Sequence, residues 1–86
     1  MEDLLLTDRR LWDLVQAENR KQVEKWGVQN HHPYAWLAFN LEELGELSDA
    51  ISENLYRGGS IIDVVKEAIQ AATLSLKIAE MYLNED

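Results

Sequence analysis

Residues 33–57 read PYAWLAFNLEELGELSDAISENLYR and form the longest periodic stretch of the chain. Pro33 is well tolerated in the first turn of a helix, and Gly58 is expected to end that helix after Tyr56 or Arg57. Between these limits, the spacing of one set of mostly apolar side chains is that of a packing seam in a helical bundle. The leucine seam consists of Leu37, Leu41, Leu44, Ser48, Ile51 and Leu55. The stretch therefore predicts a long amphipathic helix.

A further helix is predicted on each side of this stretch. The first is expected to begin after Thr7, whose hydroxyl can cap it, and to run to about Trp26. The last is expected to begin after Ser60, which opens a capping-box-like pattern, and to continue to about Leu83. Its middle, residues 68–76, is small or apolar at nearly every position and suits an interior or a subunit interface. The sequence predicts an all-α fold of three main helices.

The length of the chain bears on how this fold can be stable. A domain of 86 residues buries little surface, and the absence of cysteine excludes a disulfide, a thiolate metal site and a thiol nucleophile. Active bundles use about four helices around a site, whereas this chain offers three, with a break expected near residues 52–56. We therefore expect residues 1–86 to form one domain, a compact helical bundle completed by assembly into a homodimer or homotetramer.

Charge and hydrophobicity exclude several classes of protein. A net charge of −8 and a pI of about 4.6 argue against binding a nucleic-acid backbone, and a phosphate-bearing molecule could approach only with divalent cations. A hydrophobic content of 47% is too high for a disordered chain, and no apolar run is long enough to cross a bilayer. The acidic start of residues 1–6 is the reverse of a secretory signal. We expect a cytoplasmic protein that binds neither nucleic acid nor membranes.

Acidic side chains gather on faces of two of the predicted helices. Glu43 and Glu46 lie on adjacent turns beside the leucine seam, and Asp63, Glu67 and Gln70 share one stripe of the last helix. Crowded carboxylates on a partly apolar surface are unfavourable unless they are protonated, paired or bound to a cation. Oxygen ligands without histidine or cysteine favour Mg²⁺ or Mn²⁺, although a lone E-x-x-E is more often solvated surface.

Three segments together resemble the MazG-like all-α NTP pyrophosphohydrolase superfamily, whose signature is E-E-x-x-E followed by E-x-x-D on a later helix. They are Trp26-Gly27-Val28-Gln29-Asn30-His31, Leu41-Glu42-Glu43-Leu44-Gly45-Glu46-Leu47 and Lys66-Glu67-Ala68-Ile69-Gln70-Ala71. The first segment also resembles the dCTP-pyrophosphatase branch in order and spacing. The resemblance covers about residues 17 to 80.

The resemblance implies a set of site residues. Glu43, Glu46 and Glu67 would be Mg²⁺ ligands, and Glu42 would be a supporting acid or general base. Gln70 stands where the family usually has an aspartate ligand; its amide oxygen can bind Mg²⁺ but brings no negative charge, so the affinity for the metal should fall. The missing carboxylate could instead come from Asp63, one turn before Glu67.

Substrate contacts are implied at three positions of the first segment. Trp26, Gln29 and His31 would bind the nucleotide, but Trp26 also suits a core position, and His31 could instead cap the following helix. Lys66, Lys77 and Arg57 are candidate phosphate neutralisers, although such residues are more often solvated or paired surface charges.

The resemblance implies a Mg²⁺-dependent hydrolase that converts a (d)NTP and water into a (d)NMP and pyrophosphate and so clears unwanted nucleotides. Gln70 motivates an alternative, a catalytically impaired relative that acts as a nucleotide sensor or as a helical protein-interaction module. A third hypothesis is a structural dimerisation bundle in which the acidic stripes only confer solubility.

Overall fold

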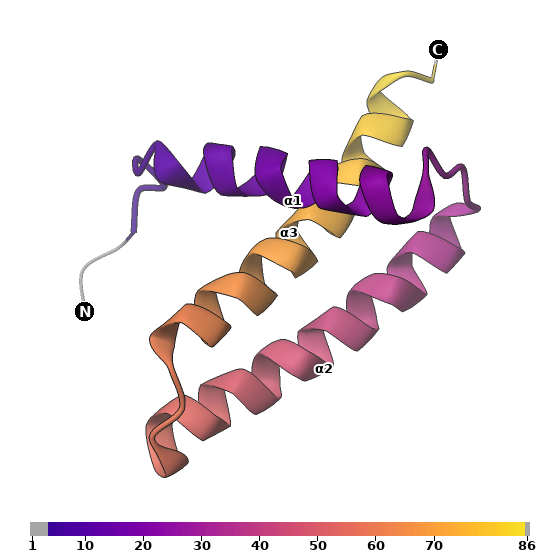
Figure 1. Cartoon of the computed structure of the whole chain (residues 1–86). Coiled ribbons are helices and arrows are strands. Elements are labelled where there is room, and N and C mark those ends of the chain that lie inside the picture. The colour runs from indigo at the N-terminus through magenta and orange to yellow at the C-terminus, as the bar shows by residue number, and fades with distance from the viewer. Residues whose placement is uncertain (1–3, 86) are drawn as a thin grey trace.

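The computed structural model describes residues 4–85, which form three α-helices and no β-strand. The helices are α1 (Arg10–Trp26), α2 (Pro33–Arg57) and α3 (Ile61–Leu83). Helices α2 and α3 run side by side in opposite directions, and α1 crosses α3 (Figure 1). Helices α1 and α2 have no pair of Cα atoms within 8 Å of each other, so α3 is the central element. The predicted all-α fold of three helices is confirmed.

Local signals set the ends of α2 and α3 where the sequence predicts them. Helix α2 is continuous from Pro33 to Arg57 and ends at Gly58, where the backbone is left-handed with a φ of 74°, so the break expected near residues 52–56 is absent. Helix α3 is capped by Ser60, whose Oγ accepts a hydrogen bond of 3.0 Å from the backbone N–H of Ile62. Both boundaries confirm the prediction from proline, glycine and serine.

The start of α1 differs from the prediction. The helix begins at Arg10 rather than directly after Thr7, and the Asp8 carboxylate accepts a hydrogen bond of 3.0 Å from the backbone N–H of Arg10. The same carboxylate pairs with the Arg10 guanidinium at 2.7 Å. The prediction of a Thr7 cap is therefore wrong, because Asp8 lies nearer to the first free N–H and binds it.

The face of α2 that packs against α3 is not the leucine seam. The buried and half-buried positions of α2 recur one residue away from it, which is a rotation of about 100° around the helix. They include Trp36, Ala35, Asn40, Glu43, Leu47, Ala50 and Asn54. Asn40 donates a hydrogen bond of 2.6 Å to Oγ of Ser75 across the two helices. The prediction that the leucine seam is the surface of α2 packed inside the chain is thus wrong. The face of α2 that contacts α3 instead includes one carboxylate, that of Glu43.

Within residues 4–85 the leucine seam remains largely exposed. Leu41 is 59% exposed and Leu55 is 64% exposed, whereas the buried apolar core is small and lies between α2 and α3. This core consists of Trp36, Ile69, Ala71 and Leu74. No helix within residues 4–85 combines the length and the apolar character that crossing a bilayer requires.

Candidate functional site

Three carboxylates from two helices meet beside the α2–α3 contact. Glu43 and Glu46 on α2 and Glu67 on α3 each offer an oxygen atom within 4.8 Å of the others. Glu43 and Glu67 are half-buried, whereas Glu46 is exposed. The convergence follows from the packing, because Glu43 lies on the face of α2 that contacts α3 and Glu46 is one turn further along. We call Glu43, Glu46 and Glu67 the carboxylate cluster.

Gln70 lies inside the same arrangement. One terminal atom of its amide is 2.8 Å from Oε2 of Glu43 and 2.8 Å from Oε2 of Glu67. With nitrogen at that position the amide donates to both carboxylates, and this is the orientation that satisfies its hydrogen bonds. The amide therefore bridges the two helices, and a cation bound by its oxygen would require the amide to turn over.

The proximity of the acids changes the ionisation of Glu43. Burial, the hydrogen bond with Glu67 and the negative charge of Glu46 together raise the pKa of Glu43 to about 7. The largest cause is burial, because a half-buried carboxylate loses part of its hydration. At neutral pH roughly half of the molecules therefore keep a proton on Glu43, whereas an exposed glutamate would be almost fully ionised.

Two further acids lie at the edges of the cluster. Glu42 is exposed and lines the groove described below, next to Glu43. Asp63 is exposed and lies in a shallow depression of about 220 Å³ shared with Glu46 and Glu67. Asp63 is not part of the group whose oxygens converge. The fourth side chain that joins the three acids of the cluster is therefore Gln70 and not Asp63.

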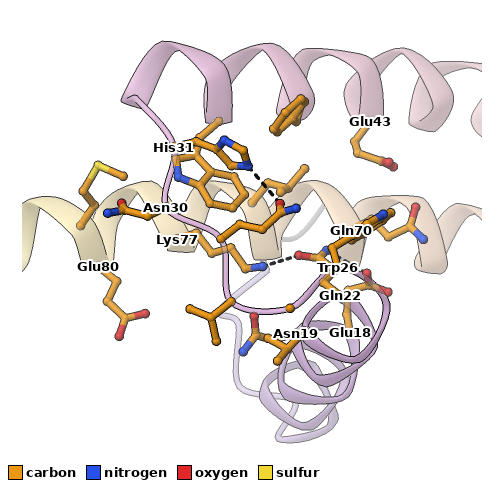
Figure 2. A pocket seen from close by; sticks show the side chains of 18 of the residues that line it. Glu18, Asn19, Gln22, Trp26, Asn30, His31, Glu43, Gln70, Lys77 and Glu80 are labelled. Carbon is orange, nitrogen blue, oxygen red and sulfur yellow. Dashed lines mark hydrogen bonds between the residues drawn. The ribbon is translucent and has the colours of Figure 1, made fainter.

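A groove of about 990 Å³ extends from this cluster between α1, the loop 27–32, α2 and α3 (Figure 2). The structure brings the three predicted substrate-binding residues, Trp26, Gln29 and His31, to this one groove. Glu43 and Gln70 line the same groove, and Figure 2 shows Glu43 on the side away from His31 and, in that view, Gln70 beside Trp26. Of the residues that the resemblance assigns to the metal, Glu43 and Gln70 line this groove, whereas Glu46 and Glu67 line a neighbouring depression.

Aromatic rings form part of the groove wall. His31 packs edge-on against Trp36, with ring centres 4.8 Å apart, and against Phe39 at 5.4 Å. Its Nε2 lies 3.0 Å from Oε1 of Gln29. The neighbouring His32 caps α2, with Nδ1 accepting a hydrogen bond from the backbone N–H of Tyr34, so the capping alternative for His31 is wrong.

The predicted phosphate neutralisers are separated by the fold. Arg57 pairs with Glu53 at 2.9 Å on the exposed end of α2, and Lys66 is exposed outside the groove. Lys77 is half-buried in the groove and donates a hydrogen bond to Gln22 of α1. Sequence reasoning missed Gln22, because a glutamine among polar helix residues carries no signal of burial.

Comparison of the chain with known protein families, with characterised proteins and with solved structures found no match. Membership of the MazG-like superfamily stays a prediction. A functional proposal for this protein rests on its own residues and their geometry.

Proposed function

We propose that the protein is a MazG-like, Mg²⁺-dependent nucleoside triphosphate pyrophosphohydrolase, which converts a (d)NTP and water into a (d)NMP and pyrophosphate. One observation carries this proposal: Glu43, one of the three acids of the carboxylate cluster, lines with Gln70 the same groove that Trp26, Gln29 and His31 line. A nucleotide has phosphates that need cations and a base that needs apolar contacts, and this groove is lined both by acids and by aromatic rings.

The residues of the cluster fit a divalent cation. Three oxygens within 4.8 Å of one another suit an ion that binds several oxygens. The pKa of Glu43 is raised first by burial and then by the neighbouring acids, so a positive charge at this site, from a proton or from a metal ion, is favourable. Carboxylate and amide oxygens are ligands that Mg²⁺ and Mn²⁺ prefer. When bound, Mg²⁺ would offset the charge of the substrate's phosphates and make an attacking water more acidic.

The other side chains of the groove have separate tasks in this proposal. Glu42 is exposed beside Glu43 and is available to accept the proton of the attacking water. Trp26 and His31 offer ring surface to the base, and Gln29 is held by its contact with the His31 ring. Substrate binding is thus assigned to α1 and the following loop, and hydrolysis to α2 and α3.

The proposal is tested by incubating the protein with Mg²⁺ and a panel of ribonucleoside and deoxyribonucleoside triphosphates. Pyrophosphate and the monophosphate should appear together for at least one nucleotide. The Glu43→Gln variant should lose this activity, and Glu24→Gln, which changes an exposed glutamate of α1 outside the groove, should keep it. A folded protein that releases no pyrophosphate from any member of the panel at millimolar Mg²⁺ contradicts the proposal.

A second candidate function is a nucleotide sensor or interaction module of the same fold. It is favoured by the Gln70 amide, which satisfies Glu43 and Glu67 without any cation. A sensor should bind nucleotides saturably without releasing pyrophosphate, and Gln70→Asp should create turnover by restoring a fourth carboxylate. Turnover by the unchanged protein excludes this candidate.

We also propose that the chain works as a homodimer or homotetramer. A monomer of 9.9 kDa is expected to expose roughly 5,200 Å², whereas this chain exposes 7167 Å². The difference of roughly 2,000 Å² is what each partner buries in a large, obligate interface. The uncovered leucine seam of α2 is the apolar surface best placed to supply it. Analytical ultracentrifugation tests this point, and a sedimenting monomer at micromolar concentration contradicts it.

A further inference from the structure

Lys77 of α3 is a groove residue that the proposed hydrolysis does not use. Within residues 4–85 it is the only lysine or arginine lining the groove. Its ammonium donates a hydrogen bond to Oε1 of Gln22 and lies 5.3 Å from the centre of the Trp36 ring (Figure 2). Burial lowers the pKa of Lys77, and the nearby Glu18 carboxylate opposes this. The groove thus holds one cationic donor against an aromatic wall.

Gln22 fixes the position of this ammonium. The Gln22 side chain belongs to a residue only 9% exposed, and its Nε2 donates a hydrogen bond of 2.8 Å to Oε2 of Glu18. Oε1 of Gln22 is therefore the atom turned towards Lys77, and the three side chains form one hydrogen-bonded chain from α1 to α3. An ammonium has three N–H donors, so Lys77 can still donate to a ligand, at a reduced entropic cost because it is already held.

The place of Lys77 along α3 indicates which part of a nucleotide it meets. Lys77 follows Gln70 by seven residues, two turns along the same face of the helix, which is roughly 10 Å along the axis. Phosphates at the carboxylate cluster would leave the base near Lys77. A phosphate at Lys77 itself would face the carboxylates of Glu18 and Glu80, which also line the groove, whereas a neutral carbonyl oxygen adds no charge there.

We propose that Lys77 selects the base, by donating a hydrogen bond to the exocyclic keto oxygen of a nucleobase that lies against the aromatic wall. The proposal rests on the proposed function in taking the ligand to be a nucleotide. Hypoxanthine carries an oxygen where adenine carries an amino group, and a lysine ammonium cannot accept a hydrogen bond from that group. A hydrogen bond from a charged donor corresponds to roughly ten- to hundred-fold in affinity.

The experiment measures the binding of inosine and adenosine, nucleosides without phosphate, in the presence of a chelator. Quenching of tryptophan fluorescence reports binding because Trp26 and Trp36 line the groove. Inosine should bind at least ten-fold more tightly than adenosine. Lys77→Met should remove that ratio with adenosine affinity unchanged, and Lys21→Met, an exposed lysine of α1 outside the groove, should keep it.

A ligand change tests the same contact in the unmodified protein. Purine riboside lacks the exocyclic oxygen and should bind like adenosine, so the proposal can be judged even where Lys77→Met fails to fold. Equal binding of inosine and purine riboside overturns the proposal. So does a Lys77→Met variant with native helicity that weakens inosine and adenosine equally, because a purely structural role would have that effect.

Triphosphates separate this proposal from the proposed function. If inosine binds more tightly than adenosine in a way that depends on Lys77, and no nucleotide releases pyrophosphate, the result supports base selection by Lys77 and contradicts the proposed hydrolase function. Pyrophosphate release with equal kcat/KM for inosine and adenosine triphosphates supports the hydrolase and overturns base selection. Lys77→Met that weakens inorganic triphosphate in Mg²⁺ but keeps the inosine preference assigns Lys77 to phosphate and also overturns it.

Discussion

Replacing Glu43 with glutamine should make the metal-free protein more stable at alkaline pH. The pKa of Glu43 is raised from 4.5 to about 7, so the unfolded chain loses this proton more easily than the folded one. The contribution of Glu43 to stability is therefore fully present below about pH 4.5 and is lost as the pH rises through about 7. Glutamine keeps the shape of the side chain and removes the charge that causes this loss.

The expected size follows from the same pKa. The full shift corresponds to roughly 3 kcal/mol at pH 8, and solvent screening at this partly exposed site reduces it to about 1 to 2 kcal/mol. In a domain of this size that is a difference in Tm of roughly 5 to 10 °C.

The assay is urea unfolding with EDTA, at one protein concentration, at pH 5 and pH 8, for the unchanged protein, Glu43→Gln and Glu24→Gln. The difference in unfolding free energy between Glu43→Gln and the unchanged protein should be about 1 to 2 kcal/mol more favourable to the variant at pH 8 than at pH 5. The same difference for Glu24→Gln should hardly change between the two pH values. A Glu43→Gln variant that is less stable than the unchanged protein at pH 8 refutes the reasoning, because Glu43 would then be stabilised as an anion.

Five other outcomes are expected. Saturating Mg²⁺ should raise the Tm of the unchanged protein by roughly 10 °C in thermal scans, and an unchanged Tm favours a purely structural bundle. Gln70→Asp should tighten Mg²⁺ binding at least roughly ten-fold in calorimetry and lower the metal-free Tm, because two bridging hydrogen bonds become repulsion. Gly59→Ala should cost about 1 to 3 kcal/mol in urea unfolding, since an added Cβ would lie 2.8 Å from Cβ of Glu53. Gly45→Ala, which meets nothing within 4 Å, should instead stabilise α2 by up to about 1 kcal/mol. Leu44→Lys should shift the sedimentation of the assembly towards monomer with helicity retained, whereas unchanged sedimentation places the interface elsewhere.

Local sequence signals predict the helices of this protein well. Pro33, Gly58 and Ser60 act on the backbone within one turn of themselves, so their effect does not depend on the rest of the fold. The same reasoning fails at Thr7, because Asp8 lies two residues before Arg10 and its carboxylate accepts the hydrogen bond from the backbone N–H of Arg10. Helix ends are predictable where one candidate cap stands alone.

The packing face of α2 is less predictable. The stripe through Leu37 and Leu41 and the stripe through Trp36 and Asn40 differ by one residue, and periodicity alone favours the more apolar one. Which stripe meets α3 depends on contacts between segments far apart in the sequence, such as Asn40 with Ser75. The more apolar stripe is left exposed in the single chain.

In the candidate site, too, some residues are predictable from the sequence and others are not. Helical spacing places Glu43 and Glu46 on one face and Glu67 on a polar stripe, the resemblance to the MazG-like superfamily selects these three, and the structure brings them together. The contact between Gln22 and Lys77 joins residues 55 positions apart, and neither residue belongs to a regular sequence pattern that would indicate the contact. Carboxylate clusters leave a sequence pattern, whereas a single cross-helix hydrogen bond does not.

Because α1 contacts α3 and not α2, the two working parts of the groove are held by different pairs of helices. The α2–α3 pair fixes the distances within the carboxylate cluster, while the side of the groove formed by α1 is tied to α3 through Gln22 and to α2 only through the loop 27–32. A tilt of α1 would widen or narrow the groove without moving the acids. Under the proposed function, substitutions in α1 and the loop 27–32 would change which ligands the groove accepts and leave the arrangement of the acids unchanged, so ligand preference could be engineered one helix at a time.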